Sequence, residues 1–166
     1  MDLTTKNFLD RSENELIIAE TLRDISNDSK KKEFLKIPLE ISFYSAVISH
    51  SYYAIFYSAK AILLTKDIKT TFPEVHKKTY DEFDNNFVKT GIIDVKLLEI
   101  YQKMIIRADH LLEIFKDLKF KRGLFTYQTI SQANKEYAED SLKNAKLFVN
   151  NITKIVKIID EDIENV

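Results

Sequence analysis

The polar side chains that could do chemistry gather in one almost uncharged segment, SHSYYAIFYSAKAILL, which runs from Ser49 to Leu64. Tyr53 lies about one helical turn after both Ser49 and His50, so on a helix the three share one side. Polar groups inside an apolar bundle need hydrogen-bond partners. The spacing therefore predicts either a buried polar network or a cleft beside these three residues.

Four aromatic rings cluster within six residues of the same segment: Tyr52, Tyr53, Phe56 and Tyr57. Aromatic rings bury a large area, so packing in the core or at an interface is the plainest interpretation of the cluster. The four rings exceed what one small core readily absorbs. We therefore expect a symmetric homodimer, since two-fold association is the commonest form of oligomer.

The histidines carry no recognisable metal motif. His50, His76 and His110 fall on three different predicted helices, and the chain has no HExxH pattern. The three side chains could converge, but one packed and two exposed histidines is the simpler interpretation. Two glycines cannot build a Gly-rich phosphate loop. The sequence thus predicts no metal and no cofactor.

A basic run, KDLKFKR, spans Lys116 to Arg122 and interleaves four cations with Leu118 and Phe120. Cations interleaved with apolar side chains are typical of surfaces that bind single-stranded nucleic acid. A solvated helix end, where cations favour the helix dipole, explains the same pattern. Both interpretations remain open for this run.

The composition is that of one globular domain over residues 1–166. A net charge of −1 argues against a wholly basic nucleic-acid-binding surface, although it permits a local basic patch. The absence of cysteine excludes disulfides and thiolate catalysis and suits a reducing cytosol. The first residues lack the apolar region of a secretory signal, so we expect a cytoplasmic protein.

The segment from Ile41 to Leu64 has Lys60 as its one formal charge and is long enough to resemble a membrane span. Its many serines, and the high charge of the rest of the chain, favour a central helix enclosed by other helices instead. We therefore expect this helix to be the most buried one and expect no association with membranes.

A few helix-breaking and helix-capping residues mark the ends of the predicted helices. Pro38 and Pro73 flank the apolar helix, Gly91 is placed to cap a helix C-terminus, and Asp94 is placed to cap the next N-terminus. Apolar periodicity predicts helices over about 4–27, 39–66, 75–90, 95–120 and 132–160, with a loop at NDSKKKE. The predicted fold is all-α, an up-and-down bundle of four long helices plus one short helix.

Several segments together resemble the HEPN domain family of small prokaryotic proteins over residues 38–160. The Ser49–Leu64 segment is similar to the family's Tyr-Tyr-Ala helix, and NNFVKTG is similar to its FVKTG element. His76 matches the family's histidine-containing segment, and the stretch from Arg122 to Tyr127 is similar to its Arg-x4-Tyr element. The helix AEDSLKNAKLFVNNI is similar to the last helix of the family.

This resemblance implies a helical bundle that dimerises through its central helices. It also implies a metal-independent RNase or toxin activity, often in proteins paired with a minimal nucleotidyltransferase. The family's catalytic element is Arg-x(4–6)-His, in which histidine serves as acid or base and arginine contacts the phosphate.

The chain departs from that element, because no histidine follows any of its arginines at the family spacing. Tyr127 stands where the family histidine would act after Arg122, and a phenol with a pKa of about 10 transfers protons poorly at pH 7. His50, brought in from the second long helix, is a substitute. Arg107 and His110 form an alternative site, although they lie only three positions apart.

Three hypotheses follow. The first is a HEPN-type module that binds RNA or a nucleotide, or a nucleotidyltransferase partner, as a component of a toxin–antitoxin or defence system with weak or no catalysis. The second is an active RNase toxin using Arg122, Tyr127 and His50. The third is a purely structural helical adaptor. The RNA-binding residues predicted for the first hypothesis are Ser49, Tyr53, Lys119, Lys121 and Arg122.

Overall fold

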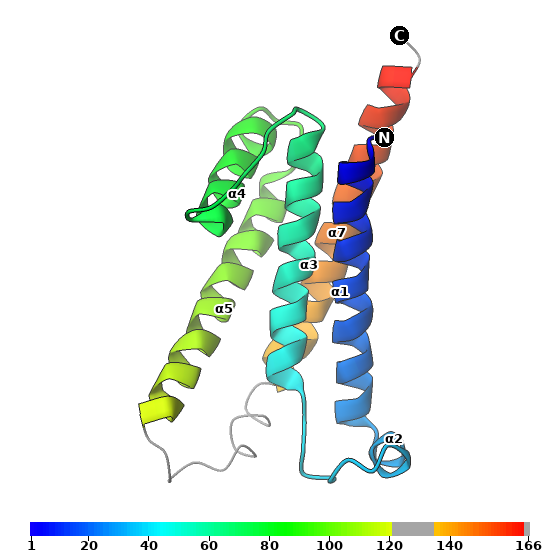
Figure 1. The fold of residues 1–166 in the computed structure, drawn as a ribbon, viewed down its shortest axis with the longest axis vertical. Helices are drawn as coiled ribbons and strands as arrows, with labels where there is room; N and C mark the ends of the chain where they lie inside the picture. Colours follow the sequence, from blue (N-terminus) through cyan, green and yellow to red (C-terminus); the bar gives the residue numbers. More distant parts are fainter. Residues whose placement is uncertain (121–134, 165–166) are drawn as a thin grey trace.

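The fold was described from a computed structural model, which places residues 1–120 and 135–164. Within these residues the regular elements are all helical, as predicted. They are α1 (Leu3–Asn27), α2 (Ser29–Phe34), α3 (Tyr44–Leu64), α4 (Val75–Phe83), the π-helical turn η1 (Asp84–Val88), α5 (Val95–Phe120) and α7 (Lys135–Glu164). Figure 1 shows α1, α3, α5 and α7 running alternately down and up. The all-α, up-and-down bundle is thereby confirmed.

Helix α3 is the centre of the bundle. It packs against α1, α7, α4 and α5, and most of its residues are buried (Figure 1). Its one cation, Lys60, is half-buried. The near absence of charge between residues 41 and 64 thus reflects enclosure by other helices. No helix in the placed part of the chain has the length and apolarity that crossing a bilayer requires.

Helix α3 begins at Tyr44, five residues later than the sequence predicted. The preceding residues instead form a turn, in which the Ile41 amide donates to the Pro38 carbonyl. Side chains of the earlier helices hold this turn, because Lys32 Nζ donates to the Leu39 carbonyl and the Phe43 amide donates to Ser26 Oγ. These long-range hydrogen bonds take the place of the predicted first helical turn.

The NDSKKKE segment is not the predicted loop. It contains the short helix α2, whose N-cap is Asp28. The Asp28 carboxylate accepts hydrogen bonds from the amides of Lys30 and Lys31, at 2.9 and 3.2 Å. An aspartate at the N-cap satisfies amides that otherwise lack partners, and this stabilises a helix too short to show apolar periodicity.

The helix predicted over 75–90 divides into α4 and η1, where the register widens. Gly91 then adopts a positive φ of 76°, and its amide donates to the Val88 carbonyl, as expected of a C-terminal glycine. Asp94 caps α5 as predicted, accepting from the Lys96 amide at 2.8 Å. Helix α1 matches its predicted range closely, and α7 is described from Lys135 onward.

Candidate functional site

Helix α4 lies beside α3 and α5 (Figure 1). Residues of these three helices line a cleft of about 470 Å³. Its lining combines aromatic rings, one imidazole, one cation and one carboxylate with a few apolar side chains. The lining residues are Tyr52, Tyr53, His76, Lys77, Tyr80, Ile105, Ala108, Asp109 and Leu112.

Helix α3 contributes both buried and exposed aromatic rings to the surroundings of this cleft. Tyr52 and Phe56 lie one turn apart and are both buried, whereas Tyr53 is 40% exposed. All three approach His76, with ring centroids 5.7, 6.2 and 4.2 Å away for Tyr52, Tyr53 and Phe56. The imidazole is therefore set into an aromatic wall that remains open to solvent at Tyr53.

The centre of the cleft is a hydrogen bond of 2.8 Å between the Tyr52 hydroxyl and His76 Nδ1. Burial lowers the pKa of His76, and the positive charge of Lys60 lowers it further. Burial also raises the pKa of Tyr52, with smaller contributions from Tyr53 and Asp109. At neutral pH the imidazole is therefore uncharged and the phenol protonated, a combination suited to binding and, at most, to taking up a proton.

Among the predicted site residues whose side chains the structure describes, Tyr53 alone lines the cleft. His50 instead faces α1, where its Nδ1 lies 2.6 Å from Oε2 of Glu15. Ser49 is half-buried and does not line the cleft. Ser49, His50 and Tyr53 therefore do not form one site. Their side of α3 lies between two neighbours, so that His50 contacts α1 whereas Tyr53 faces α4.

The alternative pair, Arg107 and His110, is not assembled as an arginine–histidine site. Arg107 turns towards α7, where its guanidinium donates to Ser141 Oγ at 3.0 Å and pairs with Asp140 at 2.7 Å. Its Cζ also lies 5.3 Å from the ring centroid of Tyr137. His110 is exposed on α5. The residues between them, Ala108 and Asp109, are the ones that reach the cleft.

The side chains of Lys119, Lys121, Arg122 and Tyr127 fall outside the part of the chain that the structure describes. The combination of Arg122 and Tyr127 with His50, on which the second hypothesis depends, therefore stays a prediction. Among the placed side chains, no three histidine, aspartate or glutamate residues gather as a metal site would require.

Sequence reasoning missed Tyr52, Lys77, Tyr80 and Asp109 as cleft residues. It matched His76 to the family's histidine-containing segment but did not include it among the site residues. A signal for part of the cleft was present, because His76, Tyr80 and Phe83 follow one another at the spacing of one helix face. The sequence did not indicate that this face packs against α3, because the Tyr52–His76 contact joins residues 24 positions apart.

Comparisons with known proteins identify the family of the chain. The HEPN domain model matches residues 30–156. Two proteins of Methanocaldococcus jannaschii, each named a "putative toxin", are 33% and 31% identical to the chain over 124 and 112 residues. These matches cover 75% and 68% of this chain, and 79% and 65% of the respective relatives. No solved structure is a significant match. With a family match over most of its length and a curated relative above 30% identity, the chain belongs to the HEPN domain family.

Proposed function

We propose that this chain is a toxin-type HEPN module that binds single-stranded RNA through the cleft between α3, α4 and α5, with weak or no cleavage. The observation that carries the proposal is the aromatic wall around His76, in which the Tyr53 ring is exposed beside Lys77. Unstacked bases bind to aromatic faces, and a nearby cation favours the phosphate. The names of the two relatives support the toxin class.

The carboxylate in the cleft fits RNA better than it fits a simple anion. Asp109 would repel a bare phosphate, but a carboxylate accepts hydrogen bonds from the amino groups of bases. Lys77 lies in the same cleft and would meet the backbone. A base stacked on the exposed ring of Tyr53, with its edge towards Asp109 and its phosphate towards Lys77, would satisfy each of these groups.

The chemistry of the cleft favours binding over cleavage. Cutting RNA through its 2′-hydroxyl needs a base for that proton and an acid for the leaving oxygen. His76 is uncharged near neutrality and can serve only as the base, whereas the raised pKa of Tyr52 makes its phenol a poor acid. One half of the acid–base pair is thus missing from the described cleft residues.

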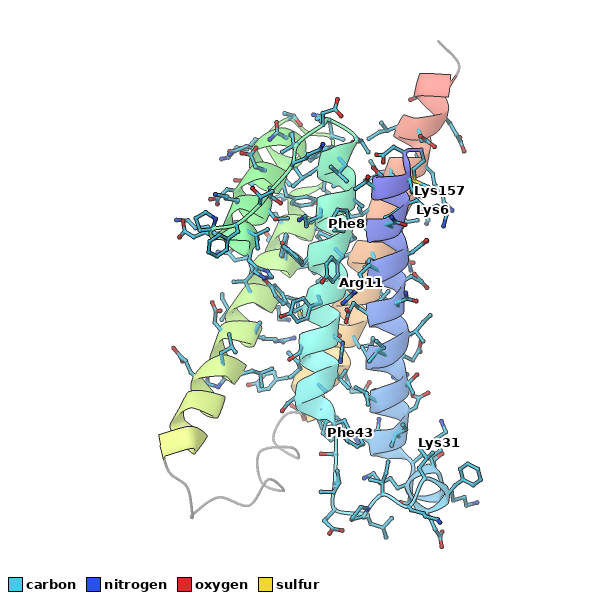
Figure 2. The ribbon with its side chains drawn as sticks, in the orientation of Figure 1. Lys6, Phe8, Arg11, Lys31, Phe43 and Lys157 are labelled. Carbon is cyan, nitrogen blue, oxygen red and sulfur yellow. The ribbon has the colours of Figure 1, made fainter. Side chains whose placement is uncertain are left out.

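The test is RNA binding by fluorescence anisotropy, using a labelled single strand of about 15 nucleotides. We expect binding that weakens steeply between about 50 and 200 mM salt, and a loss of about tenfold or more in Tyr53→Ala. Lys31→Gln is the matched control, because Lys31 is an exposed cation on α2 at the far end of the molecule from α4 (Figure 2). If the unmodified protein binds no RNA at low salt, the adaptor hypothesis replaces this one.

A metal-independent RNase is the second candidate, favoured by the uncharged His76 within an open cleft. Incubation with RNA in the presence of a chelator tests it, with His76→Asn and Tyr127→Phe as variants. Robust cleavage lost in either variant would establish an enzyme. Tyr127→His, which restores the family's catalytic spacing, should raise cleavage if Arg122 lies at the site.

Two associations are proposed on the strength of the family. The first is a homodimer, to which Tyr52 and Phe56 do not contribute exposed rings because both are buried within the chain. Light scattering at tens of micromolar tests it, and a monomeric mass would contradict it. The second is a minimal nucleotidyltransferase partner, which co-purification with the product of a neighbouring gene would reveal.

A further inference from the structure

The groove where α1 meets α3 carries a second set of aromatic and charged side chains, which we call the α1–α3 seam. Figure 2 shows two of them, Phe8 and Arg11, on the side of α1 that adjoins α3. Helix α1 ends at Asn27, before the first residue that the HEPN model matches. The seam is thus built half from family residues and half from residues outside the match. Its members are Phe8, Arg11, Glu15, His50, Tyr57 and Lys60.

The rings of the seam continue those of the cleft. Tyr53, at the mouth of the cleft, lies 6.2 Å from Tyr57 with an interplanar angle of 27°. Tyr57 in turn stacks against Phe8 of α1, at 6.1 Å and 20°. Since Tyr53 also contacts His76, one unbroken series of rings joins α4 to α1 across the surface of α3.

Two cations lie over this series of rings. Arg11 places its Cζ 5.1 Å from the ring centroid of Tyr57, and its side chain is 59% exposed. Lys60 places its Nζ 4.9 Å from the Phe8 centroid while donating one hydrogen bond to the Thr70 carbonyl. An ammonium has three donors, so Lys60 retains donors for a further acceptor.

A buried carboxylate fixes the orientation of both flanking groups. Glu15 accepts from Arg11 Nε at 3.1 Å, and its other oxygen lies 2.6 Å from His50 Nδ1. A carboxylate only accepts, so the His50 proton at this contact is on Nδ1 and Nε2 is left for another partner. The guanidinium keeps its terminal N–H groups for a phosphate while its Nε is held in place.

We propose that the α1–α3 seam extends the RNA-binding cleft, so that a single strand leaving Tyr53 stacks its next base on Tyr57 and sets its phosphates against Arg11 and Lys60. This inference rests on the proposed function, whose cleft supplies the start of the track. Base stacking on aromatic faces with cations along the backbone is the common design of single-strand binding surfaces.

Charge favours RNA over a second copy of the chain as the occupant. A two-fold interface brings the same patch of both copies together. Arg11 and Lys60 outnumber the one carboxylate of the seam, Glu15, which Arg11 already shares with His50. Pairing two seams would therefore bring like charges together and cause electrostatic repulsion. RNA is a polyanion, so its binding to the seam causes no such repulsion.

The experiment compares a long and a short RNA, of about 15 and about 4 nucleotides. The short strand fits within the cleft alone, whereas the long strand also reaches the seam. Arg11→Gln and Tyr57→Leu should each weaken the long strand by about five- to tenfold and leave the short strand unchanged. Arg11→Gln should also reduce the slope of log affinity against log salt by about 0.7. Lys31→Gln serves as the matched loss of one exposed cation elsewhere. His76→Asn, within the cleft, should weaken both lengths.

The outcomes separate the two proposals. If the unmodified protein binds neither strand, the proposed function and the seam fail together. If it binds both and the two seam variants bind the long strand normally, the seam fails while the cleft stands. If Tyr57→Leu instead lowers the mass in solution and leaves RNA affinity unchanged, the seam is an interface between copies. Arg11→Gln removes only the charge of an exposed side chain, so we expect this variant to fold. It therefore still tests the seam if Tyr57→Leu unfolds.

Discussion

The phenol of Tyr52 on α3 and the imidazole of His76 on α4 are joined at 2.8 Å and stacked with their ring centroids 5.7 Å apart. This contact fastens α4 to the central helix and places a titratable group inside an aromatic wall. Its consequences for stability and for pH can be measured directly.

We expect the free energy of unfolding to fall as the pH is lowered through 6.5, the ordinary pKa of histidine. Burial and the charge of Lys60 hold the pKa of His76 below that value in the folded protein. Below pH 6.5 the unfolded chain therefore binds the proton first, and stability is lost until the folded pKa is passed. Urea unfolding at several values between about pH 7.5 and 5.5 measures the slope. His76→Asn should flatten it, and an unchanged slope in that variant would refute the assignment.

We expect Glu15 and His50 to be energetically coupled. Glu15 is 6% exposed, so removing His50 deprives a buried carboxylate of one of its two side-chain partners. His50→Leu should lower the free energy of unfolding by about 1–3 kcal/mol. A double-mutant cycle with Glu15→Gln should give a coupling of about 1 kcal/mol.

The matched control for this cycle is His110→Leu, which replaces an exposed histidine on α5 and should change stability by less than about 0.5 kcal/mol. A coupling near zero between Glu15 and His50 would mean that Arg11 alone satisfies the carboxylate in solution.

Unlike the Glu15 carboxylate, the buried hydroxyl of Tyr101 has no hydrogen-bond partner among the placed residues. Its ring packs edge-on against Tyr80, Phe83 and Phe148. Tyr101→Phe should leave stability unchanged or raise it by about 1 kcal/mol, because an unsatisfied polar group is removed. Tyr101→Ala should cost about 3–5 kcal/mol, because a large cavity is left. Thermal unfolding measures both, and a loss in Tyr101→Phe would indicate an ordered water at the hydroxyl.

Arg107 should prove to be a structural residue. Its guanidinium bridges α5 to Asp140 and Ser141 of α7, so Arg107→Ala should lower stability by about 1–2 kcal/mol and leave RNA affinity unchanged. Lys103 shares Asp140 but is 50% exposed, so Lys103→Ala should cost less than about 0.5 kcal/mol. A fall in RNA affinity without loss of stability in Arg107→Ala would instead favour the alternative site at Arg107 and His110.

The helices were predictable where one local pattern decides the outcome. The single charge between residues 41 and 64 correctly predicted a central helix, and Asp94 and Gly91 marked helix ends by their own chemistry. Helix α2 was missed because its stability comes from the Asp28 cap rather than from apolar periodicity. The start of α3 was misplaced because hydrogen bonds from Ser26 and Lys32 hold the preceding turn.

The candidate site was less predictable because its contacts join distant parts of the chain. Tyr53 was identified from its place in the aromatic segment, but its neighbours in the cleft come from α4 and α5. His50 was placed in the same group as Tyr53, although the decisive partner is Glu15, 35 residues earlier. Spacing along one helix indicates which side chains share a side, but it does not indicate which helix covers them.

The position of α1 has a practical consequence for any attempt to isolate the family core. A fragment cut to residues 30–156 would lack Leu9, Leu16 and Ala19, which are buried in the same hydrophobic core as Ala54 and Ile55 of α3. The Ala54 carbonyl would also lose the hydroxyl of Ser12, which donates to it at 2.7 Å. The removal of α1 would expose residues of α3 that are fully buried in the whole chain, among them Ala54, so the fragment should aggregate during expression although it contains every residue that the family model matches.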